Sequence, residues 1–148
     1  MKIRTARLGD LAAIVELAQE SPTAAQRSEA SYKTILEEDH PRRIFLVAET
    51  ENKAAGFLAA RIVADECELE DIVVSLAKRR RGVASELLNK LISIVPECQV
   101  HRIFLEVRES NLAACCLYEK FGFVGIGCRT DYYRTPRENA CLYSLDLA

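Results

Sequence analysis

A basic, glycine-containing loop at the start of a predicted helix could bind a phosphate group. The loop and the first helical turn contain Arg79, Arg80, Arg81, Gly82, Val83, Ala84 and Ser85; we call residues 79–84 the arginine loop. The first turn of a helix exposes unpaired N–H groups and the positive end of its dipole, which attract phosphate. Gly82 and Ala84 have little side-chain bulk, so a pyrophosphate could approach those N–H groups. The loop matches neither a Walker A motif nor a G-x-G-x-x-G motif, and a solvated basic loop is the alternative.

A carboxylate within an apolar run is the second candidate for chemistry. Glu106 lies in HRIFLEVR (101–108), which predicts a strand. An ionised carboxylate among apolar side chains is costly unless it is paired or functional. We therefore weigh a function for Glu106 against an ion pair with Arg102 or Arg108.

Asn111 and Tyr118 are seven residues apart on a predicted helix (112–121) that Ser110 could cap, and Gly122 sits where a glycine is expected after the helix. That spacing places both residues on the same face, about 10 Å apart along the axis. A phenol has an ordinary pKa of about 10, which suits a proton donor to a thiolate of similar basicity. Packing at the edge of the core is the alternative role for Tyr118.

An acidic stretch precedes the arginine loop and contains Asp65, Glu66, Glu68, Glu70 and Asp71. Because side chains alternate along a strand, Glu66, Glu68 and Glu70 share one face. Such a face could attract a basic peptide, although a solvated edge or pairing with nearby arginines explains it equally well. Glu70 approaches the apolar core where the strands should separate, so it could also act as a second base.

The elements that must position these residues follow from hydrophobic periodicity. It predicts helices at 11–19, 27–38, 83–95 and 112–121, and strands at 2–6, 44–49, 54–64, 67–75, 101–108, 123–133 and 138–147. Pro96 ends the third of these helices. The short loops between the second, third and fourth strands indicate an antiparallel meander. Strand–helix–strand alternation in the second half requires a parallel or mixed sheet. We predict an α/β (α+β) fold with a mixed central sheet of about seven strands and four helices.

The composition indicates one folded domain over residues 1–148. The hydrophobic fraction of 49% and charged fraction of 28% suit a packed core, and the net charge of −2 argues against nucleic-acid binding through a basic face. No apolar run is long enough to span a bilayer, and Asp10 and Glu16 interrupt the segment that a signal peptide would need. We expect a cytoplasmic protein without membrane or nucleic-acid partners. The six cysteines contain no C-x-x-C pair, so we expect small buried thiols and no metal.

Two motifs carry a resemblance to a known family. Arg79, Gly82 and Ala84 fit the pattern Q/R-x-x-G-x-G/A, and with the order of elements they resemble the acyl-CoA pyrophosphate loop of the GNAT N-acetyltransferase superfamily. The run L-E-V-R-x-S-N-x-x-A-x-x-L-Y-x-x-x-G-F extends from Leu105 to Phe123 and is followed by Arg129, Tyr132, Tyr133 and Pro136. It is similar to the RimI-type ribosomal-protein-alanine N-acetyltransferases. The resemblance spans about residues 65–147, and the chain lacks the Trp that many relatives carry between the first two helices.

The resemblance implies that acetyl-CoA binds as a co-substrate and that Glu106 is a general base acting through water. It implies that Tyr118 is the general acid that protonates the departing thiolate, and that Asn111 contacts the pantetheine arm. Cofactor contacts are implied for Ile72, Val73, Val74, Arg79, Arg80, Arg81, Gly82, Val83, Ala84, Ser85, Asn111 and Tyr118. Candidates for binding the acceptor are Glu70, Asp71, Tyr132 and Tyr133.

We therefore expect an enzyme that acetylates the N-terminal α-amine of a protein by direct transfer, most simply the N-terminal alanine of a basic small-subunit ribosomal protein. An α-amine has a pKa about 2.5 units below that of lysine, so its deprotonation requires about 3.4 kcal/mol less work. A GNAT enzyme for small-molecule amines and a non-catalytic acyl-CoA-binding regulatory domain are the alternatives. The pair Glu106 and Tyr118 argues against the regulatory domain, because a domain that only binds acyl-CoA needs neither a base nor an acid. We expect a monomer or weak homodimer.

Overall fold

The computed structural model describes residues 1–25, 27–38 and 40–147, and it confirms the predicted order of elements over this part of the chain. The strands are β1 (Lys2–Thr5), β2 (Arg43–Thr50), β3 (Lys53–Val63), β4 (Glu66–Val74), β5 (Arg102–Arg108), β6 (Val124–Arg134) and β7 (Arg137–Asp146). The helices are α1 (Leu11–Glu20), α2 (Glu29–Glu38), α3 (Val83–Ile94) and α4 (Leu112–Lys120). The predicted α/β fold with a seven-stranded mixed sheet is confirmed.

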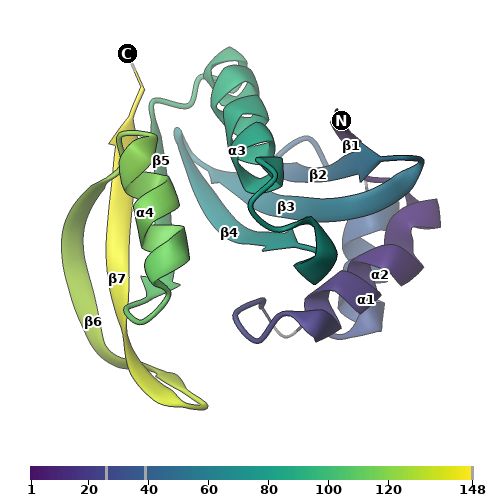
Figure 1. Ribbon diagram of the computed structural model, residues 1–148. Helices are drawn as coiled ribbons and strands as arrows, with labels where there is room; N and C mark the ends of the chain where they lie inside the picture. The colour runs from purple at the N-terminus through teal and green to yellow at the C-terminus, as the bar shows by residue number, and fades with distance from the viewer. Residues whose placement is uncertain (26, 39, 148) are drawn as a thin grey trace.

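One parallel pair interrupts an otherwise antiparallel sheet in the described residues. The strand order is β1-β2-β3-β4-β5-β7-β6, and β4 runs parallel to β5. This pairing joins residues 66–68 to residues 102–104 and ends there, although both strands continue. The two strands consequently diverge toward their C-terminal ends, as Figure 1 shows. The sheet therefore opens where we expected the strands to separate.

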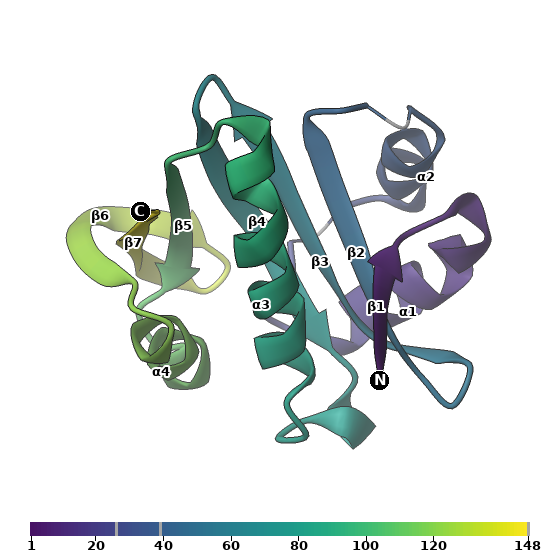
Figure 2. The ribbon, with the colours of Figure 1, turned by 90° about the horizontal axis from the view of Figure 1, so that it is seen from above.

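Helices cover both faces of the sheet (Figure 2). Leu87, Leu88 and Leu91 on α3 are fully buried against one face. Ile14 of α1 and Tyr32 of α2 belong to a second buried cluster on the opposite face. Complete burial of a leucine side chain contributes about 1.5–3 kcal/mol, so these contacts hold α3, and with it the arginine loop, against the sheet.

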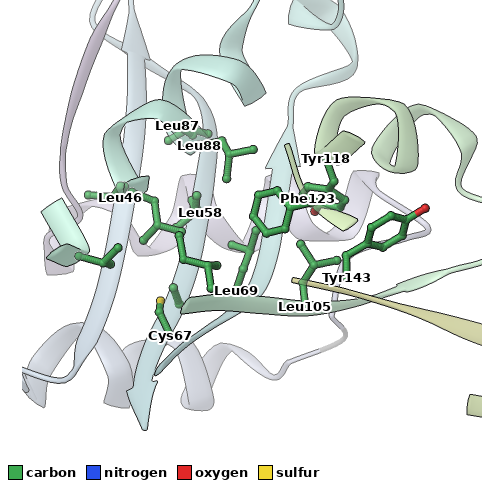
Figure 3. Packing of buried hydrophobic residues seen from close by; sticks show 14 of the residues in the cluster. Leu46, Leu58, Cys67, Leu69, Leu87, Leu88, Leu105, Tyr118, Phe123 and Tyr143 are labelled. Atoms are coloured by element: carbon green, nitrogen blue, oxygen red, sulfur yellow. The ribbon is translucent and has the colours of Figure 1, made fainter. Parts of the chain in front are cut away.

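The C-terminal turn of α4 fixes the position of Tyr118. The N–H of Phe123 donates to the Tyr118 carbonyl at 3.0 Å and the N–H of Gly122 donates to the Glu119 carbonyl at 3.0 Å, as in a Schellman motif. The rings of Tyr118 and Phe123 lie 5.5 Å apart, and Figure 3 shows both in the buried cluster near Leu105. The predicted glycine after the helix is confirmed, and it ties Tyr118 to the core.

The N-terminus of α4 corrects one prediction, because Asn111 caps the helix rather than Ser110. The Asn111 Oδ1 accepts a hydrogen bond from the Ala114 N–H at 3.2 Å. Ser110 lies one residue outside, and its own N–H donates to Glu138 at 2.6 Å. Serine and asparagine cap helices about equally well, so the residue types alone could not decide between neighbours.

A bulge at Glu70 changes the direction of the side chains of β4. Ala59 pairs with Asp71 and Ala60 pairs with Leu69, so Glu70 is an additional residue opposite β3. Leu69 belongs to the core cluster under α3, whereas both Glu70 and Asp71 contact residues between α1 and α2. Two neighbouring carboxylates therefore project from the same face of β4.

No helix in the described part of the chain has both the length and the apolarity needed to cross a membrane. The same residues contain no group of three or more His, Cys, Asp or Glu side chains that could hold a metal ion. All six cysteines are free, but Cys98, Cys116 and Cys128 are exposed. The expectation of buried thiols is wrong for these three and is confirmed only for Cys67, since Cys115 and Cys141 are half-buried. For Cys128 the reason is that β6 is exposed along almost its whole length.

Candidate active site

Three adjoining cavities lie where β4 and β5 separate. The arginine cavity (about 420 Å³) is lined by Arg79, Arg80, Val83 and Ala84, the carboxylate cavity (about 370 Å³) by Asp71 and Glu106, and the aromatic cavity (about 270 Å³) by Phe104 and Tyr132. Ile72, Asn111 and Tyr118 line both the arginine and the carboxylate cavities. Glu70, Glu106 and Tyr133 line both the carboxylate and the aromatic cavities. The three cavities thus share walls from the arginine loop to the hairpin of β6 and β7.

The arginine loop begins α3 at the wall of the arginine cavity. Gly82 is the N-cap of α3 and has φ +80°, a backbone conformation that other residues adopt only with strain. The first helical residues, Val83 and Ala84, line the cavity together with Arg79 and Arg80. The start of the helix dipole and two guanidinium groups therefore meet at this cavity, and both attract an anion.

Close packing against β3 fixes the start of α3. A Cβ atom on Gly56 would lie 2.6 Å from the Val73 carbonyl oxygen and 3.1 Å from Cγ1 of Val83. The first distance is shorter than any ordinary carbon–oxygen contact, so a larger residue at position 56 would displace the backbone. Gly56 was not among the predicted site residues, because a glycine within a strand pattern does not reveal what packs on it.

The predicted cofactor residues fall into two groups. Those that line the arginine cavity are Ile72, Val74, Arg79, Arg80, Val83, Ala84, Asn111 and Tyr118. The side chain of Val73 is buried in the cluster on the α1–α2 face, away from this cavity. Arg81, Gly82 and Ser85 belong to the same loop and first turn but are not part of the lining within the described residues.

Glu106 has one paired oxygen and one orphaned oxygen. Its Oε1 lies 3.2 Å from Nε of Arg129 on β6. Its Oε2 is buried and has no hydrogen-bond partner among the described residues. Buried polar atoms are nearly always satisfied in folded proteins. Because Glu106 also lines the carboxylate cavity, the orphaned oxygen makes this residue a candidate proton or hydrogen-bond acceptor there.

The ion pairs weighed for Glu106 in the sequence do not form in the structure. Arg102 pairs with Asp146 at 3.0 Å and Arg108 pairs with Glu138 at 3.2 Å. Arg129 takes their place and reaches Glu106 from β6, which lies on the other side of β7 from β5, so the contact depends on the sheet order. The side chain of Arg129 is 56% exposed, so this ion pair is a weak one.

Tyr132 and Tyr133 meet at the aromatic cavity because the pairing of β6 with β7 is irregular between Arg129 and Tyr133. Their ring centroids lie 5.1 Å apart, edge to face. The charge of Glu106 is the main cause that raises the pKa of Tyr132. Burial raises the pKa of Tyr133 to about 12, with the charge of Glu106 adding to it. Both phenols therefore stay protonated and can donate hydrogen bonds at neutral pH.

Tyr118 is a buried phenol on the wall between two cavities. Its side chain is packed by Phe123 and by Tyr143, whose ring centroid lies 6.4 Å away. Burial, and next the charge of Asp71, raise the pKa of Tyr118 above its ordinary value of 10. The phenol thus keeps its proton until a stronger base is present, as a general acid must.

The carboxylates of the acidic stretch are largely paired with basic side chains. This is the pairing that we weighed against a face that attracts a basic peptide. Asp65 contacts His101 at 2.7 Å, Glu66 contacts Arg102 at 3.7 Å and Glu68 contacts Arg61 at 3.3 Å. Glu70 makes ion pairs with Arg27, Arg43 and Arg61. Asp71 accepts a hydrogen bond from the Ala25 N–H at 2.9 Å. Both residues line the carboxylate cavity, but the carboxylate of Glu70 is engaged in ion pairs with three arginines, whereas that of Asp71 accepts a main-chain N–H.

Sequence reasoning missed the segment after α1. Pro22 and Thr23 line both the arginine and the carboxylate cavities, Ser21 lines the first, and Ala25 lines the carboxylate and aromatic cavities. Small, uncharged residues in a loop give no chemical signal. Arg129 was noticed as part of the family pattern but was not assigned to the site.

Residues 11–123 match the acetyltransferase (GNAT) family. The chain is 30% identical over 140 residues to a putative ribosomal protein bS18-alanine N-acetyltransferase of Bacillus subtilis, covering 95% of this chain and 91% of the relative. It is 34% identical over 120 residues to the ribosomal protein bS18-alanine N-acetyltransferase of Escherichia coli, covering 80% and 81%. The crystal structure of the Escherichia coli ribosomal-protein-S18-alanine N-acetyltransferase is similar over 99% of this chain and 94% of that chain, with a TM-score of 0.88 and 30% identity.

Proposed function

The chain belongs to the acetyltransferase (GNAT) family, and we propose that it acetylates the N-terminal α-amine of a protein, namely the N-terminal alanine of ribosomal protein bS18. One observation carries the proposal. A carboxylate with an orphaned buried oxygen, Glu106, and a protonated buried phenol, Tyr118, line the same cavity. Acetyl transfer to an amine requires these two groups, a base and an acid. A ribosomal substrate implies activity in the cytoplasm.

The arginine cavity suits the diphosphate of acetyl-CoA. The position of a Gly82 side chain is open space, and the start of α3 faces the cavity with Arg79 and Arg80. Acetyl-CoA supplies the acetyl group as a thioester when it is bound. Ile72 and Val74 would contact its pantetheine arm, together with the amide of Asn111, whose Oδ1 is already engaged as the helix cap.

Glu106 serves as the base in this proposal. Its orphaned Oε2 accepts the proton of the acceptor amine, directly or through a water molecule, while Oε1 stays paired with Arg129. An amine becomes a nucleophile only after it loses that proton. The base therefore determines how much of the bound acceptor can react.

Tyr118 serves as the acid. Its hydroxyl group gives a proton to the departing sulfur, and the raised pKa keeps that proton in place until the thiolate forms. The Schellman turn and the contact with Phe123 hold the ring rigid. A rigid acid costs little reorganisation at the moment of reaction.

The carboxylate and aromatic cavities form the acceptor side. Tyr132 and Tyr133 can donate hydrogen bonds to the main chain of an extended peptide, and the rings offer stacking surface. Glu106 places a carboxylate where an α-ammonium group would arrive, and Asp71, engaged by the Ala25 N–H, lines the wall of the same cavity. Glu70 contributes indirectly, because its ion pairs hold arginines from three parts of the chain.

The test uses purified protein, acetyl-CoA and a peptide that begins with Ala and is rich in arginine. We expect one acetyl group on the N-terminus by mass spectrometry, and no product from the same peptide with a blocked N-terminus and a free lysine. Thiol release needs a blank without peptide, because three cysteines of the enzyme are exposed. Acetylation of small amines alone supports the small-molecule alternative, and tight acetyl-CoA binding without turnover supports the regulatory domain.

A further inference from the structure

Two hydrogen bonds hold the loop between α1 and α2 at Ala25, one through its N–H and one through its carbonyl group. The Ala25 N–H donates to Oδ2 of Asp71 at 2.9 Å, and the hydroxyl of Tyr32 donates to the Ala25 carbonyl at 3.4 Å. Tyr32 is almost completely buried, with 1% exposure. The first bond joins residues 46 positions apart in the chain. Ala25 is thus anchored to β4 by one group and to α2 by the other.

The bulge in β4 is what makes this anchor possible. Regular alternation would place Glu70 and Asp71 on opposite faces of the sheet, but the additional residue lets both face the α1–α2 side. Glu70 then pairs with Arg27 at 3.2 Å, two residues beyond Ala25. Neighbouring carboxylates therefore hold the same loop at two points.

The anchored loop is a wall of the cleft. Pro22 and Thr23 line the arginine and carboxylate cavities, and Ala25 lines the carboxylate and aromatic cavities. Asp71 itself lines the carboxylate cavity opposite Glu106. A shift of Ala25 away from Asp71 would widen the cavity that receives the acceptor amine.

We propose that Asp71 is a positioning residue whose ionised carboxylate holds the α1–α2 loop against the carboxylate cavity and thereby sets the affinity for the acceptor N-terminus. The proposal rests on the proposed function, since it assigns the acceptor to this cavity. It differs from the roles of Glu106 and Tyr118, because Asp71 acts through the loop. Loss of the anchor would weaken acceptor binding more than it slows the chemical step.

The surroundings of Asp71 make the anchor sensitive to pH near neutrality. Burial raises the pKa of Asp71 to about 7, opposed by the Ala25 N–H and by the charge of Arg27, and assisted by the charge of Glu70. Tyr32 and Tyr118, the other titratable groups that feel its charge, have raised pKa values and stay neutral in this range; Glu106 faces it across the cavity. A hydrogen bond to an ionised acceptor is about twice as strong as one to a neutral group. The anchor should therefore tighten as pH rises through about 7.

The anchor can be observed directly by NMR, without any substrate. In the wild-type protein we expect the Ala25 amide resonance to titrate with a midpoint of about 7. In Asp71→Asn the amide oxygen can still accept the bond but has no proton to lose, so the resonance should not move in this range. A wild-type resonance that does not titrate, or one that titrates equally in Asp71→Asn, overturns the proposal.

Affinity for the arginine-rich peptide, measured by calorimetry without acetyl-CoA, tests the positioning role. We expect the Kd of the wild type to rise roughly fivefold from pH 8 to pH 6, relative to that of Asp71→Asn at the same pH. Dividing the Kd of the wild type by the Kd of Asp71→Asn at each pH removes the effects of titrating groups on the peptide and of groups that both proteins share. Asp71→Val, which has no acceptor atom, should bind weakly at both pH values. Asp146→Asn, which removes an exposed carboxylate paired with Arg102, is the matched control and should follow the wild type.

The outcomes separate this proposal from the proposed function. A ratio that is independent of pH, or a peptide that is not bound at any pH, overturns the role of Asp71. A peptide that is bound with the expected pH dependence but is never acetylated contradicts the proposed function alone. Kinetics add a further readout. The substitution Asp71→Asn should alter the pH dependence of KM for the peptide more than it alters the pH dependence of kcat.

Discussion

The three adjoining cavities form one cleft, whose two walls are β4 and β5. The carboxylates on these two walls have opposite surroundings. On the β4 wall, Glu70 has three arginine partners, and Asp71 accepts a main-chain N–H. On the β5 wall, one oxygen of Glu106 pairs with the largely exposed Arg129, and the second oxygen is buried without a hydrogen bond from the described residues. The β4 wall is satisfied by the protein itself, whereas the β5 wall leaves an acceptor for something that binds.

This difference separates carboxylates that hold the fold together from a carboxylate that can take part in a reaction. A carboxylate held by several arginines, as Glu70 is, ties parts of the fold together and is a poor acceptor for a proton in transit. An orphaned oxygen costs about 1–3 kcal/mol of desolvation, and a binding site can retain such a cost because the substrate offsets it. The comparison predicts that substitutions on the two walls affect different properties, turnover on β5 and stability or acceptor affinity on β4.

The largest effect is expected for Glu106→Gln. Removing a general base lowers kcat by about a thousandfold, while the fold remains intact because glutamine is isosteric. Steady-state kinetics with the arginine-rich peptide measure this effect. Glu70→Gln is the matched change on the other wall and should reduce kcat by less than tenfold while lowering the melting temperature. Equal losses of turnover in the two variants would remove the distinction between the walls.

The next effect is expected for Tyr118→Phe. Loss of the phenolic proton should lower kcat about a hundredfold, with the Kd for acetyl-CoA changed by less than about twofold, because the ring and its contact with Phe123 remain. Tyr143→Phe is the control from the same cluster, since its hydroxyl group donates to Glu119 at 3.1 Å rather than to the cleft. A normal kcat in Tyr118→Phe would show that another group donates the proton to the departing thiolate.

A stability measurement sharpens the comparison on the β4 wall. The pKa of Asp71 is raised from 3.8 to about 7 in the folded protein, so between these values the native state holds a proton that the unfolded state has lost. The stability of the wild type should therefore fall as pH rises, by about 2 kcal/mol between pH 5 and pH 7 relative to Asp71→Asn. Urea unfolding at the two pH values measures it. A wild type that gains stability relative to Asp71→Asn over this range contradicts a raised pKa.

The smallest effect is expected at the arginine loop. Gly82→Ala places a side chain at φ +80°, which costs about 1 kcal/mol and should raise KM for acetyl-CoA about fivefold with little change in kcat. Gly9→Ala is the control, because a Cβ there also meets open space but the backbone needs no positive φ. Identical KM values in the two variants would show that the conformation of Gly82 does not matter for cofactor binding.

Much of the fold was predictable because it depends on local patterns. The amphipathic spacing of Leu87, Leu88 and Leu91 identified α3, and Pro96 marked its end. The arginine loop and the glycine after α4 were predicted from residue types that suit one backbone conformation. The cap of α4 was misplaced by one residue, since neighbouring Ser110 and Asn111 are both suitable.

The site was predicted less completely, because its partners come from distant parts of the chain. Arg129 reaches Glu106 from a strand that is two positions away in the sheet. The bulge at Glu70 has no signature in the residue types, yet it decides that Asp71 faces Ala25. The small residues between α1 and α2 line cavities only because β4 and β5 separate beneath them.

The amino-acid sequence by itself determined the elements, the loop that begins α3, and the identities of an apolar-strand carboxylate and a helical phenol, because periodicity and turn chemistry act over a few residues. The tertiary structure alone decided which carboxylate is satisfied and which is left with an orphaned oxygen. Hydrogen bonds and ion pairs depend on distances of about 3 Å between groups that are far apart in the chain. Such distances are set by strand order, by one bulge and by the divergence of two parallel strands.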